Sequence, residues 1–131
     1  LVMKIEYFPD GSDDCPLILI YGDDPVGALN LQLAIERLTV GLVDSIAIHE
    51  IPGYSSVNGC QLFAEVGLSD VGIRPIEETL TFECILRNET WIDIMGLLEL
   101  FTVSVKKENV RFQYLDQTSD ISLLISTGRS W

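Results

Sequence analysis

Apolar and polar residues alternate along three segments of this chain, residues 45–51, 60–66 and 79–86. An apolar residue at every second position is typical of a strand that buries one face and exposes the other. Four other short apolar segments are bounded by turn-forming residues, which is also the pattern of strands. Those four segments are residues 3–8, 16–21, 110–115 and 121–126. A short polar turn separates the first two of these four, and another separates the last two, so the sequence predicts two hairpins.

Two segments carry apolar residues at helical spacing instead. The first covers residues 25–38, with Asp24 as its N-cap and a proline at its first position. The second begins at Thr90, which forms a capping-box pattern with Asp93, and ends near Phe101. The predicted order is ββα-βββ-αββ, an α+β fold in which two helices pack on an antiparallel or mixed sheet of about seven strands.

The size and composition of the chain suit one cytoplasmic domain. With 131 residues, of which 47% are hydrophobic, the chain can bury one core, so we expect a single α+β domain over residues 1–131. No apolar run approaches the roughly 18 residues that cross a bilayer, and the first residues lack the pattern of a secretory signal. Cys15, Cys60 and Cys84 are odd in number and have no CxxC spacing, which predicts reduced, mostly buried thiols.

The chain is strongly acidic. It carries 20 Asp and Glu against 8 Lys and Arg, a formal net charge of −12. The imbalance lies in residues 1–105, with 17 acids and 4 bases (net −13), whereas residues 106–131 have 3 acids and 4 bases (net +1). Such a surface repels nucleic acid and anionic membranes and attracts a cationic protein partner. The alternative is that the charge serves only solubility.

No motif in the sequence indicates catalysis. The one histidine, His49, lies beside Glu50 in an alternating segment and is expected to be a solvent-facing strand residue, because no nucleophile motif accompanies it. Asp10, Ser12 and Asp14 have the spacing of a calcium loop, but the later glycine and glutamate of such a loop are absent. We therefore expect no catalytic residue, no metal site and no cofactor, and a protein that binds a partner rather than an enzyme.

Residues 51–59 are rich in Gly, Tyr, Ser and Asn. Tyrosine offers a large contact area at a low entropic cost, and Ser and Asn offer adaptable hydrogen bonds, so these residue types are typical of recognition loops. An ordinary connection between two strands is the alternative. The candidate partner-binding residues of this loop and of the acidic surface are Tyr54, Ser55, Ser56, Asn58, Asp23, Asp24 and Glu50.

The first predicted helix has two apolar faces. One face, which includes Leu31 and Ile35, is expected to pack on the sheet, while Val26, Leu29 and Leu33 fall on another arc. A solvated helix does not normally carry three large apolar side chains on its outer face. We expect this stripe to be an interface, either with a second copy of the chain in a homodimer or with a partner. Cover by another part of the same chain is the alternative.

Four features follow one another within residues 28–102. A strand reading DSIAIHE covers residues 44–50, a Gly-Tyr-Ser loop with a later glycine covers 53–59, a strand covers 60–66, and a last strand containing Leu-Thr-Phe leads into a helix that ends LLELF. In this pattern the chain resembles small immunity proteins of bacterial polymorphic-toxin systems. The resemblance implies that the protein binds a cognate toxin, in many such systems a cationic nuclease, and blocks it without catalysis. The alternatives are an oligomeric structural domain and an acidic secretion chaperone.

Overall fold

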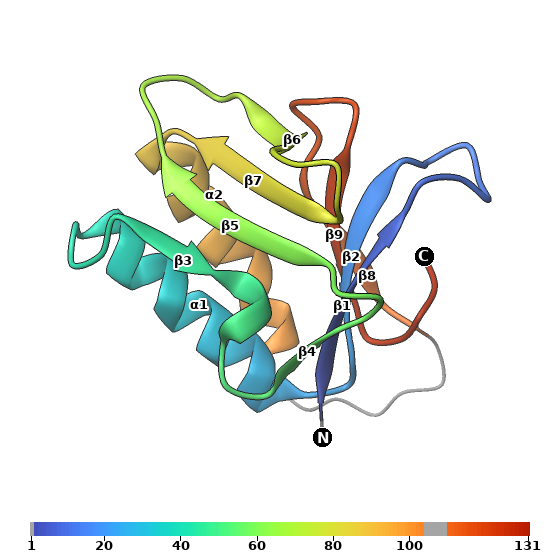
Figure 1. Cartoon of the computed structure of the whole chain (residues 1–131). Helices are drawn as coiled ribbons and strands as arrows, with labels where there is room; N and C mark the ends of the chain where they lie inside the picture. The colour runs from blue at the N-terminus through green and yellow to red at the C-terminus, as the bar shows by residue number, and fades with distance from the viewer. Residues whose placement is uncertain (1, 104–109) are drawn as a thin grey trace.

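The computed structural model describes residues 2–103 and 110–131. In these residues it contains two α-helices, two short 3₁₀ helices and nine strands, which form two sheets (Figure 1). The fold therefore belongs to the α+β class, as the sequence predicts. Neither α-helix in the described ranges is long and apolar enough to cross a membrane. The basic residues Lys106 and Lys107 lie outside the described residues.

The first sheet has five strands in the order β4-β1-β2-β9-β8. Their bounds are Met3–Phe8 for β1, Leu17–Tyr21 for β2, Tyr54–Ser56 for β4, Phe112–Asp116 for β8 and Ser122–Ser126 for β9. β1 pairs antiparallel with β2, and β8 pairs antiparallel with β9, so both predicted hairpins are confirmed. Parallel pairing of β2 with β9 joins the two hairpins into one mixed sheet.

The second sheet has four strands in the order β3-β5-β7-β6. Their bounds are Ser45–Ala47 for β3, Gln61–Val66 for β5, Gly72–Pro75 for β6 and Thr81–Leu86 for β7. The central pair, β5 and β7, runs parallel, and β3 and β6 add antiparallel edges. This sheet is therefore also mixed.

The prediction of one sheet with about seven strands is wrong, because two short strands are added and the strands divide between two sheets. β4 lies within the segment predicted as a loop at 51–59, and β6 lies in the connection between β5 and β7. Their sequences are YSS and GIRP, and three or four residues are too few to show an alternating pattern. β4 pairs with β1 and β6 pairs with β7, so each short strand adds to a longer strand that the sequence predicts.

Helix α1, Pro25–Thr39, has the start and, within one residue, the end that the sequence predicts. The backbone N–H of Gly27 donates to Asp24 Oδ1 at 3.1 Å, so Asp24 is the N-cap. Gly41 follows the helix with a φ of +79°, a left-handed conformation that favours glycine. The residues that α1 buries share one face and are Gly27, Ala28, Leu31, Ile35 and Leu38.

Helix α2, Asn88–Leu98, begins two residues before its predicted start, and the predicted capping box is wrong. Arg87 occupies the N-cap position, and its side chain makes no capping hydrogen bond. The Thr90 hydroxyl donates to Asp70 Oδ1 at 2.8 Å, and the backbone N–H of Arg87 donates to the same oxygen at 2.8 Å. A carboxylate from a distant loop therefore holds the start of α2. The 3₁₀ helix η2 (Glu99–Phe101) continues the helix.

The two helices lie side by side against one face of the four-stranded sheet (Figure 1). The main core lies between the helices and both sheets, and its residues come from all of these layers. Trp91 of α2 is fully buried there, and its indole N–H donates to the backbone oxygen of Glu65 at 2.9 Å. The opposite face of the four-stranded sheet carries the half-buried residues Phe63, Glu83 and Ile85.

The two sheets meet at a close approach between β6 and the turn before β9. The Ser119 hydroxyl donates to the backbone oxygen of Ile73 at 2.6 Å, and Ile73 forms an isolated β-bridge with Ile121. Gly72 adopts a φ of +86°, and a Cβ atom there would lie 2.7 Å from the backbone nitrogen of Ser119. A glycine is therefore required at this position for two reasons, its φ angle and the space available.

Candidate protein-binding groove

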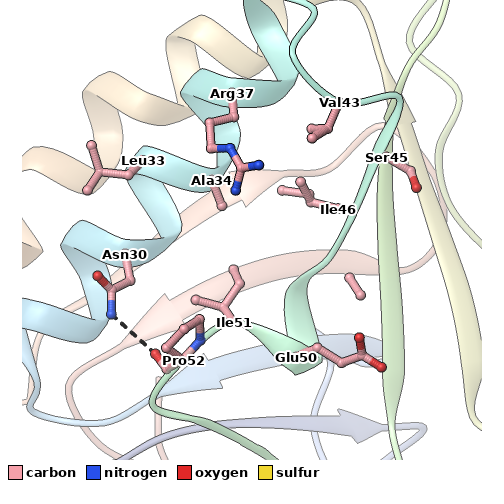
Figure 2. A pocket seen from close by; sticks show the side chains of 11 residues that line it. Asn30, Leu33, Ala34, Arg37, Val43, Ser45, Ile46, Glu50, Ile51 and Pro52 are labelled. Carbon is pink, nitrogen blue, oxygen red and sulfur yellow. Dashed lines mark hydrogen bonds between the residues drawn. The ribbon is translucent and has the colours of Figure 1, made fainter.

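A groove of about 390 Å³ lies between helix α1 and strand β3, and the 3₁₀ helix η1 (Ile48–Glu50) borders one end of it (Figure 2). β3 is an edge strand, with β5 on one side only. An edge strand leaves backbone N–H and C=O groups available for a further chain. The residues that line the groove are Asn30, Leu33, Ala34, Arg37, Val43, Ser45, Ile46, Ala47, Glu50, Ile51 and Pro52.

The groove combines an apolar floor with a charged group towards each end. Ala34, Val43 and Ile46 are half-buried and pack against the main core. Arg37 extends over the groove from α1, and Glu50, the last residue of η1, lies towards the other end (Figure 2). Both charged residues are exposed. A groove of this kind can bury an apolar side chain of a partner while its two ends offer one charge of each sign.

A hydrogen bond joins the two walls of the groove towards the start of α1. The side-chain N–H of Asn30 donates to the backbone oxygen of Pro52 at 3.2 Å (Figure 2). This contact ties α1 to the segment that follows η1. The separation of the two walls is therefore fixed at this end.

His49 is not the solvent-facing strand residue that the sequence predicts. β3 ends at Ala47, and His49 lies in η1 with only 7% of its side chain exposed. The backbone N–H of Leu62 donates to His49 Nδ1 at 3.0 Å, so the imidazole connects η1 to β5. Glu50 has 75% of its side chain exposed, and its carboxylate lies 3.8 Å from His49 Nε2. Of this pair, Glu50 is the residue that a partner can reach.

The three acidic residues predicted to bind a partner occupy different environments. Asp24 is only 8% exposed, and its carboxylate caps α1. Asp23 is exposed just before the helix, and Glu50 is exposed at the groove. Neither Asp23 nor Asp24 is among the residues that line the groove. The structure therefore brings only Glu50 to this candidate site.

Tyr54 packs in the protein and does not extend from a free loop. It begins β4, which pairs parallel with β1, and its hydroxyl donates to the backbone oxygen of Gly27 at 2.9 Å. Burial, followed by the negative charge of Asp24, raises the pKa of the Tyr54 hydroxyl well above its usual value. Ser56 is half-buried in the same strand, whereas Ser55 and Asn58 are exposed. Of the loop residues predicted to bind a partner, only Ser55 and Asn58 are exposed to one.

Replacing Tyr54 with phenylalanine is expected to lower the free energy of unfolding by about 1 kcal/mol, because the hydrogen bond from the Tyr54 hydroxyl to the Gly27 carbonyl is lost. Urea unfolding followed by circular dichroism would measure the change. Tyr7→Phe is the matched control, since Tyr7 makes a ring contact with Phe82 and its hydroxyl has no hydrogen bond within the described residues. Equal losses in the two variants would show that the Tyr54–Gly27 bond contributes nothing.

The apolar residues predicted to form an interface are exposed. Val26, Leu29 and Leu33 have 66%, 41% and 48% of their surface accessible. No element in residues 2–103 and 110–131 covers them, so internal cover, the alternative considered from the sequence, does not occur there. Leu33 also forms part of the rim of the groove.

The two buried cysteine thiols are poorly suited to chemistry. All three cysteines are free, and Cys60 and Cys84 are buried, as the sequence predicts. Burial raises the pKa of the Cys60 thiol to about 11 and raises that of Cys84 well above its usual value. A thiol with a raised pKa stays protonated and is a weak nucleophile. Among the described residues there is no group of three or more His, Cys, Asp and Glu side chains that could hold a metal ion.

Two carboxylates that are distant in the sequence meet on the outer face of the four-stranded sheet. Burial, and then a hydrogen bond with Glu83, raises the pKa of Glu65. Arg74 Nε donates to Glu83 Oε1 at 2.5 Å. Neither glutamate lines the groove. Spacing could not identify this pair because Glu65 and Glu83 come from different strands, and only the β5–β7 pairing brings them together.

The sequence predicts a binding role for only some of the residues that line the groove. The sequence predicts an interface role for Leu33 and a partner-binding role for Glu50, but it predicts no role in binding for Arg37, Val43 and Ile46. The periodicity of α1 places Arg37 beside the outer apolar stripe, but the sequence contains no signal for the packing of α1 against β3. That packing creates the groove.

Comparison of the chain with protein-family models, with curated proteins and with solved structures gives no match. The fold and the groove therefore define the protein only as an α+β domain with a candidate binding surface. Any more specific function is a proposal.

Proposed function

We propose that the protein is a non-enzymatic, cytoplasmic binding domain that takes a cationic segment of a protein partner into the groove between α1 and β3. The observation that carries this proposal is the groove itself, because its apolar floor lies beside an edge strand. An extended segment can add to such an edge while its side chains enter the groove. Exposed Glu50 supplies a carboxylate for a lysine or arginine of that segment.

The charge of the whole chain supports a cationic partner. A formal net charge of −12 attracts positive proteins over long distances and speeds their encounter with the binding surface. Near the groove the carboxylates of Glu50 and of Asp44, which precedes β3, outnumber the one base, Arg37. The association rate should therefore fall as salt increases, while the apolar contact in the groove should depend on salt only weakly.

The sequence pattern of residues 28–102 supports a toxin as the partner. All the residues that line the groove fall within that range. An immunity protein needs a surface that blocks its toxin and needs no catalytic group of its own. This agrees with the roles of His49, Cys60 and Cys84, whose side chains are engaged in the fold. Neutralising a cognate bacterial toxin is the specific form of the proposed function.

The groove is tested by filling it. Ala34→Phe places a large side chain over the floor of the groove. Peptides that bind the wild-type protein are first selected from a displayed library of extended peptides. These peptides should bind the Ala34→Phe variant at least tenfold more weakly. The selected peptides should carry Lys or Arg next to an apolar residue. Circular dichroism establishes that the variant is folded. Peptides that bind both proteins equally would place the binding surface elsewhere.

The charge at the groove is tested with a matched pair of variants. Glu50→Lys and Glu77→Lys change the net charge equally, and both residues are exposed, but only Glu50 lines the groove. We expect Glu50→Lys to weaken binding of the selected peptides about tenfold and Glu77→Lys to weaken it about twofold. Equal effects would mean that Glu50 makes no contact with the peptide.

The toxin is tested by expressing the protein encoded beside this one in its genome, alone and together with this chain. The neighbour alone should stop growth, and co-expression should restore it. Co-expression of the Ala34→Phe variant should fail to restore growth. If the protein encoded beside this one does not stop growth and does not co-purify with this chain, toxin neutralisation is contradicted. Peptide binding in the groove would then be decided by the Ala34→Phe experiment alone.

A further inference from the structure

Helix α1 and its C-cap residue Val40 expose an apolar stripe that is interrupted once, by Glu36. Val26, Leu29, Leu33 and Val40 have 66%, 41%, 48% and 63% of their surface accessible. At 3.6 residues per turn these four residues fall within an arc of about 60° on the side opposite the buried face. We refer to these four residues as the α1 seam. Leu42, just after the helix, is 73% exposed and extends the apolar surface beyond it.

The spacing of the α1 seam is that of a helix that packs on another helix. Val26, Leu33 and Val40 are seven residues apart, and Leu29 lies three residues after Val26. These are the a and d positions of a heptad, with Glu36 at the second d position. Such positions normally insert into the seam of a facing helix. In the described residues, the seam of α1 faces solvent.

The α1 seam is complementary to itself. If two copies of α1 run antiparallel around a two-fold axis near Leu33, the Val26 end of one helix lies beside the Val40 end of the other. Leu29 and Leu33 then occupy the middle of the contact in both copies. A two-fold axis needs this property, because it brings the same patch of each copy together. The antiparallel arrangement also places the opposite ends of the two helix dipoles near each other.

Charge distinguishes a second copy from a cationic partner as the occupant. Residues 25–43 carry one acid, Glu36, and one base, Arg37, and are therefore neutral in a chain whose net charge is −12. A cationic partner would find no excess of negative charge at the seam. Two copies of an acidic chain, in contrast, repel each other least where their contacting surfaces carry no net charge.

We infer that the α1 seam is the contact between two copies of this chain, related by a two-fold axis near Leu33. This dimer does not depend on the proposed function. The floor of the groove lies on the flank of α1 that carries Ala34, whereas Val26 and Leu29 lie outside the groove. Leu33 belongs both to the seam and to the rim of the groove, so a dimer built on the seam borders the groove of each copy.

The dimer should be reversible and should be favoured by salt. A single pair of helices is a smaller contact than the roughly 1,600 Å² of a standard interface, and contacts below that size are typical of weak, transient association. Salt screens the repulsion between the two acidic copies, so the dimer should become tighter as salt increases. The association of a cationic partner should instead become slower as salt increases.

Sedimentation equilibrium from about 5 to 500 µM tests the dimer. The wild type should shift from monomer to dimer over this range, and Val26→Glu with Leu29→Glu should remain a monomer, a loss of at least tenfold in affinity. The matched control is Leu68→Glu with Ile76→Glu, which adds the same charge at exposed apolar positions outside α1, 104% and 43% accessible. It should dimerise like the wild type. A wild-type chain that is monomeric throughout would overturn the inference.

Cross-linking tests the symmetry of the contact. In a Cys15→Ser background the remaining native cysteines are buried, so a cysteine introduced at position 29 or 33 would be the accessible thiol. At least one of Leu29→Cys and Leu33→Cys should form a disulfide-linked dimer under mild oxidation, and Leu68→Cys should not. A dimer in solution that neither seam variant cross-links would overturn the two-fold arrangement. Peptide binding in the groove by a monomeric chain would leave the proposed function intact.

Discussion

Replacing Trp91 with alanine is expected to lower the free energy of unfolding by about 3–5 kcal/mol, a large part of the stability of a domain of this size. Trp91 is 0% exposed and fills the core between α2 and the sheets. Its indole N–H also donates to the Glu65 carbonyl oxygen, which would lose that donor in the variant. The lower stability therefore combines the cost of a cavity with the loss of one hydrogen bond.

Trp131→Ala is the matched control for this prediction. Trp131 is half-buried, stacks edge-on against Phe8 and donates to Asp14 Oδ2 at 3.1 Å. Its removal is expected to cost about 1 kcal/mol, because a half-buried ring at the surface leaves no closed cavity. Urea unfolding followed by far-ultraviolet circular dichroism would measure both. A Trp91→Ala variant as stable as Trp131→Ala would show that Trp91 does not pack in the core as described.

Glu6→Gln is expected to lower the free energy of unfolding by about 2 kcal/mol at pH 7. Glu6 is only 7% exposed on β1, and both of its carboxylate oxygens accept hydrogen bonds from Arg129, at 3.0 and 2.9 Å. The Tyr21 hydroxyl donates to the same carboxylate at 2.9 Å. Glutamine keeps the shape but loses the charge and one acceptor, so the paired interaction with the guanidinium is lost.

The cost of Glu6→Gln should depend on pH. The hydrogen bonds from Arg129 are the main cause that holds the pKa of Glu6 below its usual value of 4.5. A lowered pKa in the folded state means that the interaction stabilises the protein fully above the unfolded value and is lost as the pH falls through the folded value. The difference between wild type and variant should therefore be largest near pH 7 and should shrink below about pH 4.

Urea unfolding of both proteins at several pH values between 7 and 3 would measure this dependence. Glu89→Gln is the matched control, because Glu89 is 74% exposed and its carboxylate lies 3.7 Å from Arg87 Nη1. An exposed ion pair contributes little, so this variant should stay within about 0.5 kcal/mol of the wild type at every pH. A cost of Glu6→Gln that does not change with pH would contradict the role of the charge.

The sequence predicted the elements whose signals are local. Turn-forming residues predict the turns between β1 and β2 and between β8 and β9, and Asp24 as N-cap predicts the start of α1. Alternation located β5 and β7 within one or two residues. In each of these elements, the residues that determine the structure lie within a few positions of one another.

The failures have a common physical cause, which is that the determining contact comes from far along the chain. The start of α2 is held by Asp70, which lies 17 residues before Arg87, so Thr90 and Asp93 could not reveal it. β4 exists because β1 offers an edge to it, and the Tyr54 hydroxyl is used by Gly27 of α1. A composition typical of loops therefore does not exclude a strand, because the backbone of such a segment can pair with the edge of a sheet.

The parallel pairing of β2 with β9 has a consequence during synthesis. Leu17 to Tyr21 must pair with residues 122–126, so β2 is complete about 100 residues before its neighbour has been translated. At about 5–20 residues per second, that delay lasts roughly 5 to 20 seconds. Throughout it, the apolar segment LILIY has an unpaired edge in the nascent chain, a state prone to aggregation. The yield of recombinant protein should therefore respond to lower growth temperature and to chaperones that hold nascent chains.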